Sequence, residues 1–244
     1  MSAVSSTPAD DAGEAAGPSV ASERRVIARA AAGIGLYAGV FGATFGAVSV
    51  SSGLSIAQTM VLSAVMFTGA SQFALVGIVG AGGSPYTAVS TALLLGLRNA
   101  FYGVPVSHAL RPRGVRRLWT AQLVIDETTA MALAQQTPRA RRYAFWATGL
   151  ILFVLWNLGT LAGALVGGSI NPSTFGLDAA APAIFLALLW PQLARPGAHL
   201  VAIGAAALAA VLIPLAPAGV PIIAASSVAI AAGVSASRLQ GADR

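Results

Sequence analysis

The 244-residue sequence contains no cysteine and only two histidines, and its cations are all arginine. Without cysteine the chain has no disulfide, thiolate nucleophile or cysteine-ligated metal. Without lysine it cannot form a Schiff base, which excludes retinal attachment. His108 and His199 are too few for a histidine-rich metal cluster. The sequence also has no G-x-x-x-x-G-K-[ST] phosphate-binding loop, so the chain does not hydrolyse ATP by that route. With these candidate groups missing, we predict no cofactor and no metal.

Charge of either sign is scarce. Charged residues make up 9 % of the chain and hydrophobic residues 56 %, whereas a soluble domain has roughly 25 % charged residues. No charged side chain occurs from Ala30 to Leu97, a run of 68 residues. Because one bilayer crossing needs roughly 20 apolar residues, this run is long enough for about three membrane-depth helices. The short arginine clusters then fit topology determinants better than a nucleic-acid surface.

We predict an all-α polytopic membrane bundle of about seven or eight transmembrane or re-entrant segments, with no strands. Residues 1–24 are expected to be a disordered tail and residues 25–238 one membrane domain. Arg24, Arg25 and Arg29 flank the start of the first apolar segment, which predicts a cytoplasmic N-terminus and a multi-pass protein of the inner (plasma) membrane. The expected segments are 27–50, 57–80, 86–109, 118–136, 143–168, 174–194, 197–215 and 218–237.

The fourth segment, 118–136, conflicts with the rule that arginines stay on the cytoplasmic side. One arginine cluster, 111–117, precedes it and another, 139–142, follows it. If the segment crosses the membrane, one cluster lies outside. If it is re-entrant or broken, both clusters can be cytoplasmic. The sequence leaves both alternatives open.

Glycines recur at helical spacing in two segments. Gly35, Gly39, Gly42 and Gly46 share one helical face, and Gly159, Gly163 and Gly167 repeat the pattern later. Small residues at this spacing let two helices approach closely within a membrane. We favour packing inside the chain and keep contact with a partner subunit as the alternative.

Two adjacent acids, Asp126 and Glu127, lie near the centre of the fourth segment. On a continuous helix neighbouring residues point about 100° apart, so the two acids cannot share one partner equally. We expect Asp126, with Gln122 and Thr129 on its face, to meet a polar interior and pair with a cation. Glu127 is expected to lie in a drier environment that suits a proton or substrate-amine site. The alternative is a solvated helix end.

Arg98 ends the charge-free run inside an apolar segment, where a cation costs about 2.5–3.5 kcal/mol on insertion scales. Asn99 follows it, and Tyr102 lies one helical turn away on the same side. A guanidinium there can hold a substrate carboxylate at two points or neutralise Asp126. Snorkelling of Arg98 to a nearby interface is the simpler alternative.

Polar interruptions occur in two further segments. Gly69, Ser71 and Gln72 interrupt the second one, as in transporters that unwind a helix to bind the polar ends of a substrate. A close helix contact explains the same residues. Asn157 in the fifth segment is expected to form an interhelical hydrogen bond, with a pore-lining role as second choice. His108 is expected to be an interfacial histidine at a helix end.

Four sequence runs together carry a family resemblance: GASQFALVGIVGAGGSP at 69–85, L-R-x-x-x-Y-G at 97–103, I-D-E-T at 125–128 and W-x-x-G-T-x-x-G at 156–163. With these runs the sequence resembles the AzlC family, the large subunit of two-component branched-chain amino acid exporters. The resemblance covers roughly residues 25–237. Family members usually have a histidine where this chain has Asn99, which shifts any proton role toward Asp126 and Glu127.

The resemblance implies export of leucine, isoleucine and valine, with methionine as a further candidate. It also implies a small AzlD-like membrane subunit as partner, and energy from the proton gradient or membrane potential. In the mechanism we favour, alternating access, Arg98 meets the substrate carboxylate, Asp126 its ammonium group, and Phe67 and Phe73 its side chain. Two other classes stay open: a non-transporting assembly or regulatory subunit, and an intramembrane hydrolase using Ser71, which lacks a G-x-S-x-G context.

Overall fold

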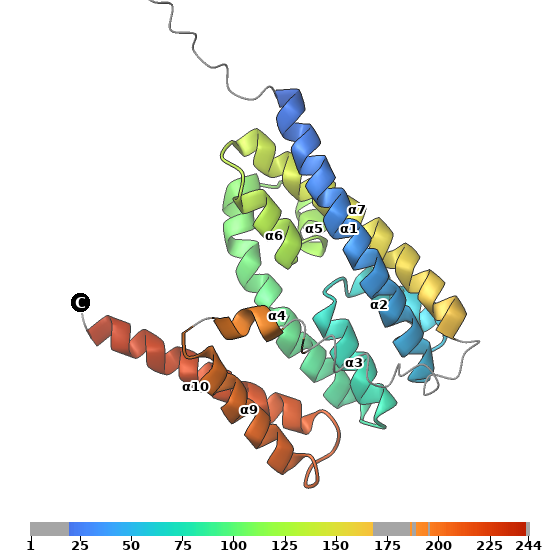
Figure 1. Ribbon diagram of the computed structural model, residues 1–244, viewed down its shortest axis with the longest axis vertical. Coiled ribbons are helices and arrows are strands. Elements are labelled where there is room, and N and C mark those ends of the chain that lie inside the picture. The colour runs from blue at the N-terminus through green and yellow to red at the C-terminus, as the bar shows by residue number, and fades with distance from the viewer. Residues whose placement is uncertain (1–19, 168–185, 187–188, 195, 243–244) are drawn as a thin grey trace, which may run out of the picture.

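Two long helices that run side by side in the same direction form the scaffold of the fold, α1 (Val20–Ser51) and α7 (Pro138–Gly167). The computed structural model describes residues 20–167, 186, 189–194 and 196–242. At one end of the pair the guanidinium of Arg24 lies 5.1 Å from the ring centre of Tyr143. At the other end Ala47 meets Gly167, so the two helices are parallel (Figure 1). Among the described helices, only α1 and α7 pass a length and hydropathy test for crossing a membrane.

The two glycine stripes face each other at the α1–α7 contact. A Cβ atom at Gly163 would overlap the carbonyl oxygen of Ala43, and one at Gly167 would lie 2.7 Å from Cα of Ala47. From the other side, a Cβ at Gly42 would overlap the carbonyl oxygen of Trp156. The predicted packing inside the chain is therefore confirmed. The alternative, that these stripes receive a partner subunit, is wrong, because the partner of each stripe is the other stripe.

Replacing Gly46 by alanine is expected to lower the free energy of unfolding by about 1–3 kcal/mol, the usual cost of overpacking. The added Cβ would overlap the carbonyl oxygen of Thr160, and Ala164 N would lie 2.7 Å away. Gly33→Ala in the same helix is the control, since nothing lies within 4 Å of its new Cβ. Thermal unfolding of the purified variants checks this. Equal melting temperatures for the two variants would contradict a close α1–α7 contact.

The predicted second segment, 57–80, is a helical hairpin. Helix α2 (Ile56–Val65) begins beside the end of α1, where Ser49 and Thr59 share a 2.7 Å hydrogen bond between their hydroxyl groups. The chain unwinds at 66–69, with Gly69 at φ 59°, and α3 (Ala70–Gly80) then runs back to the same end. There, a Cβ at Gly80 would lie 2.7 Å from Oγ of Ser52. The segment turns back midway along α1 and does not continue to the other end.

The predicted fourth segment, 118–136, is also a broken hairpin, and it comes from the opposite end. Helix α4 (Pro85–Leu110) first returns the chain along the length of the fold. Helix α5 (Arg116–Gln122) then descends, residues 123–125 unwind, and α6 (Asp126–Leu133) climbs back. The start of α5 lies at the start of α7, because Arg116 and Arg142 line one hollow. After α6, the carbonyl of Gln135 accepts a 2.8 Å hydrogen bond from Nε of Arg141.

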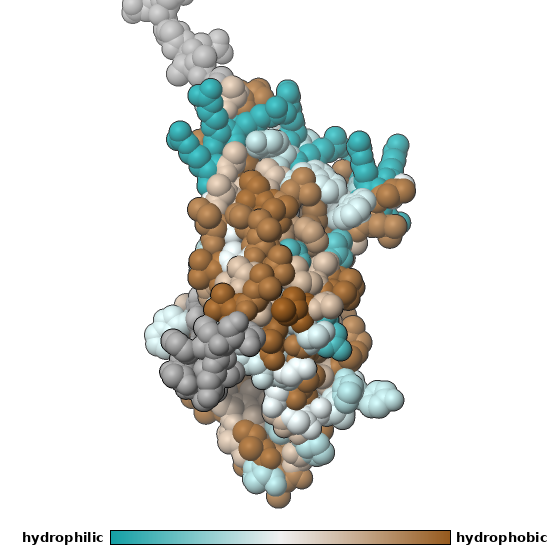
Figure 2. Space-filling view, turned by 90° about the vertical axis from the view of Figure 1, so that its right-hand side faces the viewer, coloured by the Kyte–Doolittle hydropathy of each residue, from teal (hydrophilic) through white to brown (hydrophobic). Residues whose placement is uncertain are grey.

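The topology conflict in the sequence is resolved by this hairpin. Because the fourth segment returns to the end from which it started, both arginine clusters flanking it lie at one end of the molecule. The N-terminal cluster joins them there, as the contact of Arg24 with Tyr143 records. Figure 2 shows hydrophilic side chains gathered at this end above a largely apolar body. We call this end of the molecule the arginine end. Its arginines are Arg24, Arg25, Arg29, Arg111, Arg113, Arg116, Arg117, Arg139, Arg141 and Arg142.

The C-terminal part forms a further helical pair, α9 (Ala198–Leu212) and α10 (Val220–Ala242), preceded by a short 3-10 helix at Trp190–Ala194. The loop between α9 and α10 packs on the start of α4, where a Cβ at Gly219 would lie 2.5 Å from Thr87. Most of the predicted segment 174–194 lies outside the described residues, as do residues 1–19 of the predicted tail. Residues 20–24, which we assigned to the tail, are helical and extend α1.

Candidate functional site

The tips of the two hairpins meet in the middle of the fold. Gln122, the last residue of α5, donates from its amide nitrogen to the carbonyl oxygens of Ala64 at 2.8 Å and Val65 at 3.1 Å. These carbonyls belong to the final turn of α2, where a helix leaves such groups without partners in its own ladder. The side-chain amide of Gln122 therefore links the two hairpin tips, and it donates hydrogen bonds to carbonyl groups that the end of α2 leaves without helical partners.

Each break is stabilised by a buried polar side chain three residues into the helix that follows it. Gln72 accepts from the backbone N–H of Gly69 at 3.1 Å and donates to the carbonyl of Leu62 at 3.2 Å. Thr128 accepts from the N–H of Ile125 at 3.1 Å and donates to the carbonyl of Leu123 at 2.6 Å. At membrane depth such groups need internal partners, because lipid supplies none. These bonds hold the unwound residues in place.

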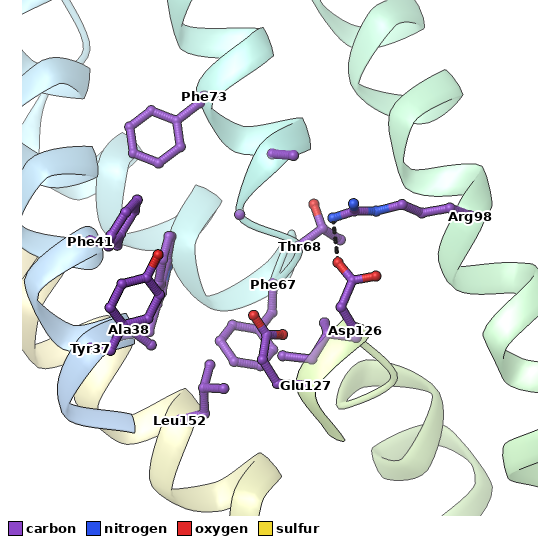
Figure 3. A pocket seen from close by; sticks show the side chains of 14 residues that line it. Tyr37, Ala38, Phe41, Phe67, Thr68, Phe73, Arg98, Asp126, Glu127 and Leu152 are labelled. Carbon is purple, nitrogen blue, oxygen red and sulfur yellow. Dashed lines mark ion pairs between the residues drawn. The ribbon is translucent and has the colours of Figure 1, made fainter. Parts of the chain in front are cut away.

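A pocket lies where the hairpin tips face α1, α4 and α7 (Figure 3). Most of its wall is apolar, and rings stiffen that wall: Phe45 packs edge-on against Phe73 at 5.5 Å, and Phe67 against Phe153 at 5.0 Å. Three charged side chains, Arg98, Asp126 and Glu127, interrupt this apolar surface. The residues that line the pocket are Tyr37, Ala38, Phe41, Phe67, Thr68, Gly69, Ala70, Phe73, Arg98, Ile125, Asp126, Glu127, Leu152 and Trp156.

Arg98 and Asp126 form an ion pair across the pocket. Nη2 of Arg98, from the middle of α4, lies 2.9 Å from Oδ2 of Asp126, the first residue of α6. Their side chains are 42 % and 41 % exposed, so the pair is open to the pocket. The prediction that Asp126 pairs with a cation is confirmed, and Arg98 does not snorkel away to an interface. The break also places both acids in the first turn of a helix, where the helix dipole favours negative charge.

Glu127 lines the same pocket but is directed away from the ion pair. In Figure 3 the carboxylate of Asp126 turns toward Arg98, whereas that of Glu127 turns to the opposite side. The expected divergence of the two acids is thus present, although it arises at a helix start. Gln122 does not share a face with Asp126, because the break separates them. The pocket therefore contains one compensated carboxylate and one that no salt bridge among the described residues compensates.

Of the residues we predicted at a substrate site, Gly69, Arg98, Asp126 and Glu127 line this pocket. The other five lie outside its lining. Gln72 is fully buried and holds the first break, and Tyr102 packs against the hydrophobic core. Ser71 and Asn99 each have a buried oxygen without a hydrogen-bond partner among the described residues. Asn157 donates to Phe153 of its own helix at 2.8 Å, so the expected interhelical bond from its amide is not formed.

Several pocket residues were not predicted from the sequence. Tyr37 and Phe41 form an aromatic pair on α1 with ring centres 4.6 Å apart, and Trp156 lines the pocket from α7. The indole nitrogen of Trp156 is buried and has no hydrogen-bond partner among the described residues. A spacing of four residues between Tyr37 and Phe41 was the available signal. It was easy to overlook, because aromatic side chains are common on apolar helices.

The histidines lie away from the pocket. His108 is exposed in the last turn of α4, as expected, and its Nδ1 lies 2.9 Å from the carbonyl of Val104. The hydroxyl of Ser71, the nucleophile of the hydrolase alternative, contacts no base among the described residues. A serine nucleophile needs an adjacent base. The arrangement at Ser71 therefore offers no support for hydrolysis.

An all-helical fold with long apolar helices, two broken hairpins and a charged central pocket defines this chain as a helical membrane protein. A sequence model for the family described as "AzlC protein" matches residues 33–170, more than half of the chain. The chain belongs to the AzlC family.

Three curated relatives are similar at low identity. An uncharacterized membrane protein of Helicobacter pylori is 26 % identical over 66 % of this chain and 71 % of its own length. Inner membrane protein YgaZ of Escherichia coli is 29 % identical over 62 % of this chain and 65 % of its own. Branched-chain amino acid transport protein AzlC of Bacillus subtilis is 23 % identical over 68 % of this chain and 67 % of its own length. No solved structure matches. These similarities support a transport-related role in a membrane.

Proposed function

We propose that this protein is a secondary transporter that exports branched-chain amino acids, with methionine as a further candidate, across the inner (plasma) membrane. The observation that carries the proposal is a pocket with one cation and two carboxylates in a mostly apolar wall. The printed name of the Bacillus subtilis relative, a branched-chain amino acid transport protein, supports the substrate class. The arginine end would face the cytoplasm, following the positive-inside tendency.

A zwitterionic amino acid fits the charges of the ion pair. Its carboxylate would replace Asp126 on Arg98, and its ammonium group would take the place of Arg98 on Asp126. Arg98 and Asp126 therefore each keep an oppositely charged partner when the substrate replaces the contact between them. This matters because unpaired charges are costly at membrane depth. The aliphatic side chain would lie against Phe67 and Phe73, where apolar contact favours leucine, isoleucine and valine over polar amino acids.

Glu127 is the group we propose for proton coupling. The ion pair compensates Asp126, so Glu127 is the pocket carboxyl free to gain or lose a proton. A proton on Glu127 would neutralise the pocket when it contains no substrate. An exporter driven by the proton gradient must carry protons inward while substrate leaves. Alternating protonation of Glu127 on the two sides of the membrane meets that need.

Breaks at the hairpin tips are the natural positions for conformational change. The two hairpins come from opposite ends and meet through Gln122, so movement of either would open the pocket toward its own end. Unwound helices with substrate sites near the midplane are common in secondary transporters. We also propose a small AzlD-like membrane subunit as partner. It would bind elsewhere than the glycine stripes, which are occupied within the chain.

Leucine efflux from intact cells tests the proposal. Cells supplied with a leucine-containing dipeptide accumulate leucine, and expression of this chain with the small partner subunit is expected to speed its release. Parallel cultures express the chain alone, the partner alone or neither. A lysine-containing dipeptide is the substrate control, because its cationic side chain does not suit the apolar wall. Leucine release that is the same in all four cultures would overturn the proposed function.

A further inference from the structure

A second hollow lies at the arginine end, and its lining shares no residue with the central pocket, which we call the transport pocket. It is lined by arginines from three parts of the fold: Arg111 and Arg113 follow α4, Arg116 begins α5 and Arg142 lies in the first turns of α7. Thr120 and Trp146 complete its polar and aromatic lining. We call it the arginine hollow. Positive-inside topology accounts for arginines at this end, but does not by itself require four of them to converge on one hollow.

No carboxylate offsets these four cations in the described part of the chain. The acids there are Glu23, Asp126 and Glu127. Glu23 lines a different hollow with Met131 and Gln135, and the other two acids line the transport pocket. The one ion pair within the described ranges joins Arg98 to Asp126. Arg142 also borders a neighbouring hollow with Arg24 and Arg139, which adds further positive charge. Because like charges held close together repel one another, we expect an anion from outside these ranges to bind there.

Apolar side chains adjacent in sequence to the residues of the hollow indicate where the anion comes from. Val115, Leu118 and Trp119 are 70 %, 72 % and 59 % exposed; Val115 directly precedes Arg116, and Leu118 and Trp119 lie between Arg116 and Thr120 in the sequence. Exposed aliphatic and indole groups beside cations are typical of the membrane interface, where the headgroup meets the acyl chains. A free anion in solution would gain nothing from these apolar side chains. A lipid would contact the arginines with its headgroup and the apolar side chains with its acyl chains.

We propose that the arginine hollow binds the phosphate headgroup of an anionic phospholipid from the adjacent leaflet. Guanidinium groups suit phosphate because their planar N–H groups donate in pairs to its oxygens. Basic pockets between helices at the cytoplasmic face are a general mode of anionic lipid recognition. A headgroup in the hollow joins the end of α4, the start of α5 and the start of α7. It thereby anchors the hairpin that presents Asp126 and Glu127.

Lipid retention by the purified full chain tests the proposal. Native mass spectrometry would compare binding of phosphatidylglycerol with that of phosphatidylcholine, and inorganic phosphate would serve as competitor. The hollow variant is Arg113→Gln with Arg142→Gln. The control is Arg25→Gln with Arg29→Gln, which removes the same charge from the same end, at exposed residues outside the hollow. Each arginine that contacts the headgroup is expected to contribute about a fivefold change in affinity, and arginines outside the hollow make no such contact.

The hollow variant is expected to bind phosphatidylglycerol about 25-fold more weakly, from two arginines at about fivefold each. The control variant and phosphatidylcholine binding should change little. If the hollow variant does not fold, Arg113→Lys with Arg142→Lys keeps the charge and is expected to lose a smaller part of the affinity. Equal losses in the hollow and control variants would overturn the proposal in favour of diffuse charge. Full displacement of lipid by millimolar inorganic phosphate would overturn it in favour of a free-anion site.

Discussion

Replacing Glu127 by glutamine is expected to abolish leucine export driven by a pH gradient while leaving the fold intact. Glutamine has nearly the same shape as glutamate, and Glu127 makes no salt bridge in the described part of the chain that the change would break. Loss of a group that transfers a proton typically slows a reaction by about 100-fold or more. Exchange of internal labelled leucine for external leucine needs no net proton movement, so it should persist.

Proteoliposomes containing the purified protein and its partner separate these two activities. Gradient-driven efflux is measured after an external acid step, and exchange is measured at equal pH on both sides. Glu23→Gln is the matched control, because Glu23 is an acid at the arginine end outside the transport pocket. Efflux at the wild-type rate in Glu127→Gln would show that another group carries the proton. Loss of both efflux and exchange would show that Glu127 binds substrate.

The helix contacts could be predicted from the sequence because membrane packing depends on small residues at fixed spacing. The stripe from Gly35 to Gly46 and that from Gly159 to Gly167 each indicated a close contact on one helical face. The spacing did not reveal that the two stripes contact each other in parallel, because that depends on the direction of every segment between them. The direction in turn depends on two hairpins, each of which looks like a single crossing by length.

The broken helices could be predicted only in part. Gly69 and its neighbours signalled an interruption, and the arginine clusters on both sides of residues 118–136 signalled an unusual segment. The second break, at 123–125, contains Leu123, Val124 and Ile125 and so has no local glycine or proline signal. It depends on tertiary bonds, above all the hydroxyl of Thr128 and the amide of Gln122. Such partners become identifiable only in the folded chain.

The charged part of the site was predictable and the polar part was not. Ionisable groups at membrane depth are costly, so Arg98, Asp126 and Glu127 stood out by their positions inside apolar segments. Amides and hydroxyls at membrane depth are less costly than charges, so they stand out less in a sequence. From the sequence, Gln72 suits a substrate ligand and a partner for unwound backbone equally well. Its bonds to Gly69 and Leu62 assign it to the second role. Sequence reasoning therefore identified the charged residues of the pocket, but it also assigned to the site five polar residues that do not line the pocket.

Breaking the ion pair from either side is expected to destabilise the protein more than removing both of its members. Arg98→Gln leaves Asp126 as an uncompensated acid, and Asp126→Asn leaves Arg98 as an uncompensated cation. Loss of one partner from a fully buried pair costs about 3–5 kcal/mol. Because the two side chains are 42 % and 41 % exposed, we expect a smaller cost of about 2 kcal/mol for each single variant. The double variant should recover most of it.

The wild-type protein, the two single variants and the double variant form a double-mutant cycle. Thermal unfolding of these four proteins in the same lipid nanodisc measures their stability, and leucine binding to the same four proteins is measured separately. Stability should return in the double variant, but binding should not, because the substrate needs the guanidinium for its carboxylate and Asp126 for its ammonium group. Additive losses of stability would mean that the 2.9 Å contact contributes no coupling. Recovery of binding together with stability would mean that the pair is structural. Loss of leucine binding in a stable double variant separates substrate binding from stabilisation of the fold. It would show that Arg98 and Asp126 are needed for the ligand and not for the fold.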